Sequence, residues 1–360
     1  MLRRAIKTGV ARALQLSCAD RLIAAYSGAR DVPLVIGYHK VVEDFRSGAE
    51  RFIPSMLISV RMVEHHLDWL GRRFRFISLD EMAERLEEGR GFEKPVAALT
   101  FDDGYSDFYH HAFPLLRRKG IPAAVFVVSD LVGTFRLQIY DELYLLLKEA
   151  LAVWRTPEKR LVQRLLGLGV PVAVVEKVQA AGMGAYQIMR ELLQGLSQDE
   201  VRLVIAGLGT EFQVAEADRK ELCALNWEML SEMQRTGMTI GSHTMTHPLL
   251  TNETWQKIRS ETEGSRKALE RKLERPIRHF AYPDGRFNPA TVRAVNAAGY
   301  RTAYTTCRHR DLHYPNLTIP RQLFWERSCL DSFGQFSPAV MNSHVHRVFE
   351  FVNGCQQEHR

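Results

Sequence analysis

Short apolar runs alternate with amphipathic segments along most of the chain, and this alternation is the feature that most constrains the fold. Each run has the length and composition of a buried strand, and the segment after it has the periodicity of a helix. Strands that alternate with helices along a chain usually pair in parallel, so the sequence predicts an α/β fold. The apolar runs occupy residues 33–39, 75–79, 96–101, 122–128, 238–243, 277–283, 300–306 and 317–324.

Capping residues set the expected ends of several helices. Ser78 and Glu81 have the spacing of a capping box, and Ser197 and Glu200 repeat it. Asn226 is placed to cap the helix that follows it. The expected helices within the alternating pattern cover residues 61–71, 78–89, 106–120, 227–236, 254–274 and 289–299.

The alternation is interrupted once. Residues 131–225 are rich in Leu, Val, Ala, Glu and Arg at helical spacing and show few strand signals. Such a segment is too long for a plain loop, so we expect a helical insertion that shapes a substrate groove or mediates assembly. The sequence thus predicts an N-terminal helix at 1–30, a main domain at 31–330 that carries the insertion, and a tail at 331–360.

Positive charge is concentrated at the N-terminus. The net charge is +6, and residues 1–30 contribute five of these charges, from six Arg and Lys residues and one Asp. The rest of the chain is close to neutral, which argues against a nucleic-acid-binding surface within the fold. The five cysteines are widely spaced with no C-x-x-C pair, so we expect reduced thiols rather than disulfides or a cysteine zinc site.

Residues 1–26 have the pattern of a basic amphipathic helix. Apolar residues such as Ile6 and Val10 fall on one side of a helical wheel, and basic residues such as Lys7 and Arg12 fall largely on the other. This pattern fits peripheral contact with an anionic membrane, and equally a helix packed on its own domain with a solvated basic face. We find no signal-peptide core, so the expected location is cytoplasmic or peripheral on the inner face of the membrane.

Polar residues follow several of the apolar runs directly. Asp102 and Asp103 end one run, His243 and His247 lie at the end of another, and His39 ends the first. The carboxyl ends of parallel strands meet on one side of the fold, where active sites gather. One carboxylate with two histidines and an open position is a standard catalytic zinc set, and such a site also accepts Co²⁺ or Ni²⁺.

Three motifs in this order resemble those of the NodB-homology polysaccharide deacetylases, carbohydrate esterase family 4. They are TFDDG at 100–104, SHTMTH at 242–247 and FAYPDG at 280–285. The GYHKV stretch at 37–41 resembles the subgroup that deacetylates poly-N-acetylglucosamine, in which the motif order is permuted. The resemblance covers roughly residues 33–130 and 226–325. It implies a distorted (β/α) barrel of the NodB-homology type, here with a helical insertion.

The resemblance also implies a role for each motif residue. It implies that Asp103, His243 and His247 bind Zn²⁺ and that Asp102 is the general base. The backbone N–H of Asp284 would stabilise the oxyanion, and His39 would protonate the leaving amine. Two tyrosines, Tyr282 and Tyr105, are candidate substrate contacts, although Tyr105 can equally cap and pack the helix that follows it.

The chain departs from the family pattern in three places, one of which is Asp284, where the usual turn has a tyrosine. Ala281 stands where the family usually has an arginine, and we hypothesise that Arg321 orients Asp102 instead. The usual Leu-x-x-His near the C-terminus is not evident, which makes His39 necessary to a catalytic interpretation.

The expected activity is that of a metal-dependent hydrolase that removes N-acetyl groups from amino sugars. The substrate would be an N-acetylated glycan or a lipid-linked saccharide of exopolysaccharide or lipopolysaccharide biosynthesis. Two alternatives remain open: a deformylase or O-deacetylase of a lipid-linked sugar, and a carbohydrate-binding relative with a decayed site. The Asp, Asp, His, His set argues against decay, since a binder needs no such set.

Overall fold

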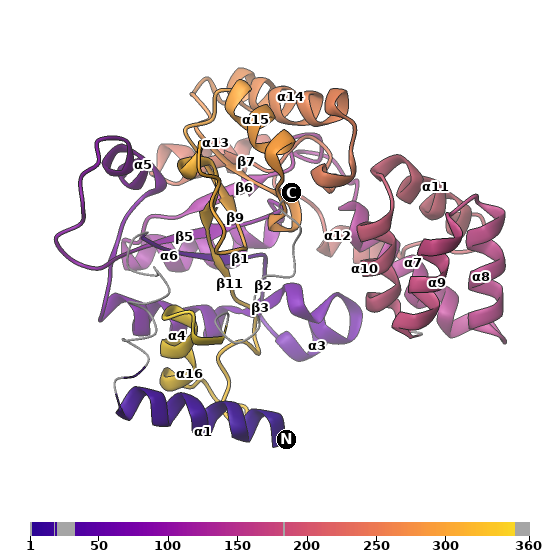
Figure 1. Cartoon of the computed structure of the whole chain (residues 1–360), viewed down its shortest axis with the longest axis horizontal. Helices are drawn as coiled ribbons and strands as arrows, with labels where there is room; N and C mark the ends of the chain where they lie inside the picture. The colour runs from indigo at the N-terminus through magenta and orange to yellow at the C-terminus, as the bar shows by residue number, and fades with distance from the viewer. Residues whose placement is uncertain (1, 18, 20–32, 183, 350–360) are drawn as a thin grey trace.

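The computed structural model describes residues 2–17, 19, 33–182 and 184–349 (Figure 1). Its main feature is one parallel sheet with strand order β10-β9-β8-β7-β6-β5-β1-β11, and β4 pairs with β5 in addition. These strands are β1 (Leu34–Tyr38), β4 (Arg75–Phe76), β5 (Val96–Phe101), β6 (Ala124–Val127), β7 (Thr239–Ser242), β8 (His279–Ala281), β9 (Thr302–Thr305), β10 (Ile319–Pro320) and β11 (Gln322–Leu323). A separate parallel pair is formed by β2 (Lys40–Val42) and β3 (Leu57–Ser59).

The two ends of this strand order are joined by one residue. Strand β10 pairs with β9, β11 pairs with β1, and only Arg321 lies between β10 and β11. One short stretch of chain therefore bonds to both edges and nearly closes the sheet on itself. The predicted (β/α) barrel is confirmed.

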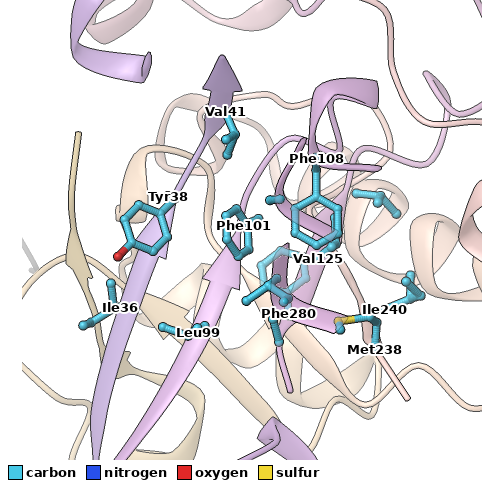
Figure 2. Close-up of a cluster of buried hydrophobic side chains, with 14 of the residues drawn as sticks. Ile36, Tyr38, Val41, Leu99, Phe101, Phe108, Val125, Met238, Ile240 and Phe280 are labelled. Atoms are coloured by element: carbon cyan, nitrogen blue, oxygen red, sulfur yellow. The ribbon is translucent and has the colours of Figure 1, made fainter. Parts of the chain in front are cut away.

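Strand β5 lies at the centre of the barrel wall. All six of its residues are buried, and it pairs with β1 on one side and with β4 and β6 on the other. A parallel strand covered on both faces needs a continuous apolar run, which is why its sequence does not alternate. Figure 2 shows Leu99 and Phe101 of β5 in the main buried cluster with Ile36 of β1, Val125 of β6 and Phe280 of β8.

Helices surround the barrel largely as predicted, with one difference at residues 106–120. That segment begins with a π-helical turn, Phe108–Ala112, before α6 (Phe113–Lys119). Pro114 has no N–H to donate to His110, so the regular bonding pattern is broken where the two segments join. The other helices are α4 (Val60–Gly71), α5 (Leu79–Glu87), α13 (Trp227–Arg235), α14 (Trp255–Leu273) and α15 (Pro289–Ala297).

The segment 131–225 contains a helical lobe beside the barrel (Figure 1). The lobe has its own hydrophobic cluster, which continues into α3 (Phe45–Arg51). Ser197 and Glu200 form the complete capping box that the sequence predicted. The helices are α7 (Ile139–Val153), α8 (Pro157–Gly167), α9 (Val172–Ala181), α10 (Ala185–Gly195), α11 (Gln198–Gly209) and α12 (Glu216–Glu221).

Helix α1 (Leu2–Leu16) packs on α16 (Pro338–Val345) at the base of the barrel (Figure 1). Lys7 Nζ donates to the carbonyl of Ser328 at 3.0 Å and lies 3.1 Å from His344 Nε2. The expected basic face therefore does not lie wholly in solvent, because Lys7 turns inward to these polar atoms. The expected apolar face is largely uncovered, with Ile6 58% and Val10 47% exposed.

Residues 20–26 of the expected membrane-contacting segment lie outside the described part of the chain. Among the helices that are described, none has the length and apolar content needed to cross a bilayer. The three described cysteines, Cys223, Cys307 and Cys329, are all free thiols.

Candidate active site

The polar residues that follow the strands gather around one cavity of about 230 Å³. Because the strands are parallel, their carboxyl ends lie on the same side of the barrel and bring distant residues together. Eight of the nine predicted site residues line this cavity: His39, Asp102, Asp103, His243, His247, Tyr282, Asp284 and Arg321.

Asp103, His243 and His247 form a compact cluster. Asp103 Oδ1 lies 3.5 Å from His243 Nε2 and 3.3 Å from His247 Nε2, and the three ligand atoms lie within 4.8 Å of one another. Both carboxylate oxygens of Asp103 are buried without a hydrogen-bond partner. An unsatisfied buried carboxylate is costly, and a cation bound between these side chains would satisfy it. The residues present therefore fit a divalent metal.

The backbone and the outer contacts orient both imidazoles towards Asp103. His243 Nδ1 lies 2.7 Å from the carbonyl of Ala281, which can only accept, so Nδ1 donates and Nε2 keeps its lone pair. Burial lowers the pKa of His243 to about 4, so its imidazole is neutral, as a metal ligand must be. His247 lies at φ 61°, and its N–H donates to Thr244 Oγ1 at 2.9 Å.

Asp102 is held by Arg321 rather than by the histidines. Arg321 Nη1 and Nη2 donate to Asp102 Oδ1 and Oδ2 at 2.6 and 2.7 Å, and Nη1 also donates to Thr100 Oγ1 at 3.0 Å. Burial alone raises the pKa of Asp102, but the charge and bonds of Arg321 outweigh it and hold that pKa below its usual value. The carboxylate is ionised at neutral pH, and the contact hypothesised from sequence is present.

His39 and the turn after β8 complete the polar part of the cavity. The half-buried His39 follows β1 and lines the cavity with Asp102 and Asp103. Tyr282 is fully buried and donates to the carbonyl of Leu317 at 3.0 Å. Asp284 has φ 55°, the left-handed conformation, within the turn Pro283–Gly285.

Tyr105 lies behind the cavity wall and is the one predicted site residue outside the lining. It is 2% exposed, and its Oη donates to Asp141 Oδ2 at 2.5 Å and lies 2.6 Å from Tyr140 Oη. Tyr140 lines the cavity and packs edge-on against His247, with ring centroids 5.3 Å apart. Tyr105 therefore contacts Tyr140, which lines the cavity, and does not line it itself. This geometry does not favour the direct contact with substrate expected from the sequence.

The sequence predicted that the insertion shapes a substrate groove or mediates assembly, but it did not identify which of its residues reach the cavity. Tyr140 and Asp141 come from α7, and burial raises the pKa of the Asp141 carboxyl to about 7. Helix α10 also faces the cavity, and the spacing of its lining residues at i, i+3, i+4, i+7 and i+8 was a signal of a helix face turned to one neighbour. Those residues are Tyr186, Met189, Arg190, Leu193 and Gln194.

The chain matches a family model described as polysaccharide deacetylase over residues 89–173 and 183–303. YxkH of Bacillus subtilis strain 168, named for the same family, is 20% identical over 253 residues, 70% of this chain and 60% of the relative. The poly-β-1,6-N-acetyl-D-glucosamine N-deacetylase of Staphylococcus epidermidis is 28% identical over 109 residues, 28% of this chain and 37% of the relative. The matches thus span 60% and 37% of the lengths of these two relatives, less than two thirds of each.

Solved structures show the same fold at low identity. The Streptococcus pyogenes deacetylase PplD, solved in complex with acetate, is 17% identical and aligns with a TM-score of 0.53. The alignment covers 86% of this chain and 96% of that chain. IcaB from Ammonifex degensii is 18% identical and aligns with a TM-score of 0.50. The alignment covers 81% of this chain and 91% of that chain.

Proposed function

The chain belongs to the polysaccharide deacetylase family, and from this premise we propose that it is a metal-dependent N-deacetylase of N-acetylated amino sugars. The observation that carries the proposal is the cluster of Asp103, His243 and His247 beside Asp102, whose carboxylate Arg321 holds in place. A site with one unsatisfied carboxylate and one oriented carboxylate supplies both a metal position and a base.

We assign the metal to Asp103, His243 and His247, and expect Zn²⁺, with Co²⁺ or Ni²⁺ as substitutes. When bound, zinc supplies Lewis acidity that polarises the substrate carbonyl and lowers the pKa of water towards ~7. Both histidines approach Asp103 through Nε2, which leaves one side of the cluster facing the cavity.

The surrounding side chains would carry the proton transfers. Asp102 is ionised and takes a proton from the attacking water, while Arg321 keeps both of its oxygens oriented. The water oxygen bonds to the amide carbon, the backbone N–H of Asp284 stabilises the charge on the carbonyl oxygen, and the C–N bond breaks. His39 donates a proton to the leaving nitrogen, so the products are acetate and a free amino sugar.

The substrate class rests on the relatives. Several are named as poly-β-1,6-N-acetyl-D-glucosamine N-deacetylases, so we propose an N-acetylated glycan of this kind as the substrate. One observation favours a second candidate, a lipid-linked saccharide from which an acetyl or formyl group is removed. Apolar side chains of Ile139, Met189 and Leu193 line the cavity and would suit an apolar group attached to the sugar.

Acetate release tests the proposal. Purified protein, chelator-treated protein and the same protein after zinc addition would be compared on β-1,6- and β-1,4-linked N-acetylglucosamine oligomers and on a lipid-linked N-acetylated sugar. We expect release that disappears with chelation, returns with zinc, and falls by ~10²–10⁴-fold in Asp102→Asn, the usual range for loss of a general base.

Asp68→Asn is the matched control, because it removes one carboxylate from the surface of α4. Release that survives chelation, or that is equal in Asp102→Asn and Asp68→Asn, would contradict the proposed mechanism. A lipid-linked N-formylated sugar tests the alternative, and formate release from it without acetate release from the N-acetylated substrates would move the assignment to deformylation.

A further inference from the structure

Helix α10 of the insertion has two faces with different neighbours. Ile188 and Leu192 are buried in the hydrophobic cluster of the lobe. The face that carries Tyr186, Met189 and Arg190 lines the cavity around the metal cluster. The insertion is therefore part of the wall of the site, although the barrel supplies every residue of the proposed metal and base set.

Arg190 connects this helix to the turn after β8. Its Nη1 donates to Asp284 Oδ1 at 2.8 Å, and Arg286 Nε lies 3.2 Å from Asp284 Oδ2. With its amide oriented as the network requires, Gln194 accepts from Arg190 Nη2 at 2.8 Å. The Asp284 side chain is thus held from two sides at a residue whose own backbone is in the sparsely populated left-handed conformation.

The C-terminal end of α10 is fixed to the loop that carries His247. Asn252 Nδ2 donates to the carbonyls of Leu193, Gln194 and Leu196 at 3.2, 3.0 and 3.0 Å. Gln198 Nε2 donates to the carbonyl of Thr246 at 2.6 Å. These bonds set the position of α10 relative to the metal cluster, so the wall is preformed.

We propose that α10 is a substrate-binding wall in which Arg190 positions the oxyanion turn and Tyr186 contacts the sugar ring. The inference deepens the proposed function and rests on it. Arg190 acts through Asp284, because its charge is matched by that carboxylate within the cavity wall. Tyr186 is 37% exposed at the cavity and offers an aromatic face to the apolar face of a pyranose ring.

The two roles predict different kinetic effects. Arg190→Gln should lower kcat for acetate release by ~10–100-fold with KM changed by less than about threefold, because a small displacement of the turn misplaces its N–H. Arg190→Lys, which keeps a cation within reach of Asp284, should recover part of the loss. An unchanged kcat per bound zinc in Arg190→Gln would overturn the positioning role, whatever its effect on stability.

Tyr186→Ala should raise KM by roughly 2–12-fold with little change in kcat, the range expected for one aromatic contact of ~0.5–1.5 kcal/mol. Tyr186→Phe should keep most of the affinity, because the ring is retained. Gln187→Ala is the matched control, since the neighbouring side chain is exposed and lies outside the cavity lining. Equal KM values for Tyr186→Ala and Gln187→Ala would overturn the role of Tyr186.

Binding separates this inference from the proposed reaction. If wild-type protein released no acetate, the proposed function would fail, and the wall would then be tested by titration of the zinc-loaded protein with an N-acetylglucosamine tetramer. We expect Tyr186→Ala to weaken that binding and Gln187→Ala to leave it unchanged. Equal binding by these two variants, or no binding by wild-type protein, would overturn the proposed substrate-binding role of α10.

Discussion

At the scale of single residues, Arg321 has the most demanding environment in the site. Its guanidinium is buried, and it forms two bonds to Asp102 and one to Thr100. A planar fork matches a carboxylate in a way that the point charge of lysine cannot. The buried charge of Asp102 therefore depends on one partner for both compensation and orientation.

Removal of that partner should cost both stability and activity. We expect Arg321→Met to destabilise the fold by ~3–5 kcal/mol, because it leaves a buried carboxylate uncompensated. The double variant Arg321→Met/Asp102→Asn should recover much of that stability while it remains inactive. Urea unfolding and acetate release measure the two effects, and a double variant no more stable than Arg321→Met would contradict the assigned pairing.

Metal binding at Asp103, His243 and His247 should increase the free energy of unfolding. Zinc at 1,000 times its Kd should stabilise wild-type protein by ~4 kcal/mol, because the ion binds the folded state and satisfies the Asp103 oxygens. Asp103→Asn should remove most of this gain. Thermal unfolding with and without added zinc measures it, and an equal zinc-induced shift in both proteins would place the ion elsewhere.

At the scale of elements, the contact between α1 and α16 depends on a histidine that titrates. Burial, followed by the charge of Lys7, lowers the pKa of His344 to about 3, below the 6.5 of an exposed histidine. His66 lies nearby, and burial lowers its pKa to about 3 as well. Both imidazoles are therefore neutral in the folded protein at neutral pH.

Acid should loosen this contact. A folded pKa below the unfolded value means that the stabilisation is complete above pH ~6.5 and is lost as the pH falls towards 3. We expect the hydrogen-exchange protection factors of α1 to drop between pH 7.5 and pH 5, and His344→Gln to reduce the drop. An identical drop in wild type and variant would show that His344 does not control the contact.

The same scale shows what the sequence could and could not predict. Strands such as β5 were predictable because an apolar run followed by Asp102 and Asp103 is a local signal. Barrel closure was expected only through the family resemblance, because no local signal pairs Ile36 with Gln322 across most of the chain. The inward turn of Lys7 was missed because a helical wheel does not include the Ser328 carbonyl that Lys7 meets.

Some residues of the candidate site could be predicted from the sequence and others could not. Its motif residues lie at strand ends and could be found from the sequence, as could the pairing of Arg321 with Asp102 as a hypothesis. The place of Tyr105 and the role of α10 depend on how the insertion folds back over the barrel, with Tyr140 and Arg190 brought in from it. The spacing of the lining residues in α10 indicated a helix face turned to one neighbour, but no local pattern identified the barrel cavity as that neighbour.

At the scale of the whole molecule, barrel closure depends on close contact between β1 and β11. Gly37 faces Leu323 across this seam, and a Cβ atom at Gly37 would lie 2.3 Å from Leu323 Cδ2. The same Cβ atom would lie 3.7 Å from Arg321 Nη1. The second distance is an ordinary van der Waals contact, so the absence of a side chain at Gly37 is required by the close approach of Leu323 and not by Arg321.

Overpacking this seam should weaken the fold. We expect Gly37→Ala to cost ~1–3 kcal/mol in urea unfolding, because Leu323 must move to admit the methyl group. Leu323→Ala in the same chain should relieve part of the cost. Gly91→Ala, at a position with nothing within 4 Å, is the control, and an equal effect of Gly37→Ala and Gly91→Ala would contradict the role assigned to the seam.

The place of Arg321 between β10 and β11 also has a consequence for the order of events during translation. His39, Asp102 and Asp103 leave the ribosome long before Arg321, the residue that lies between the two barrel edges and orients Asp102. Until β11 is synthesised, the sheet of a nascent chain stays open and the Asp102 carboxylate lacks its Arg321 partner. If the proposed function holds, activity requires barrel closure, so partly synthesised chains that lack Arg321 are expected to release no acetate.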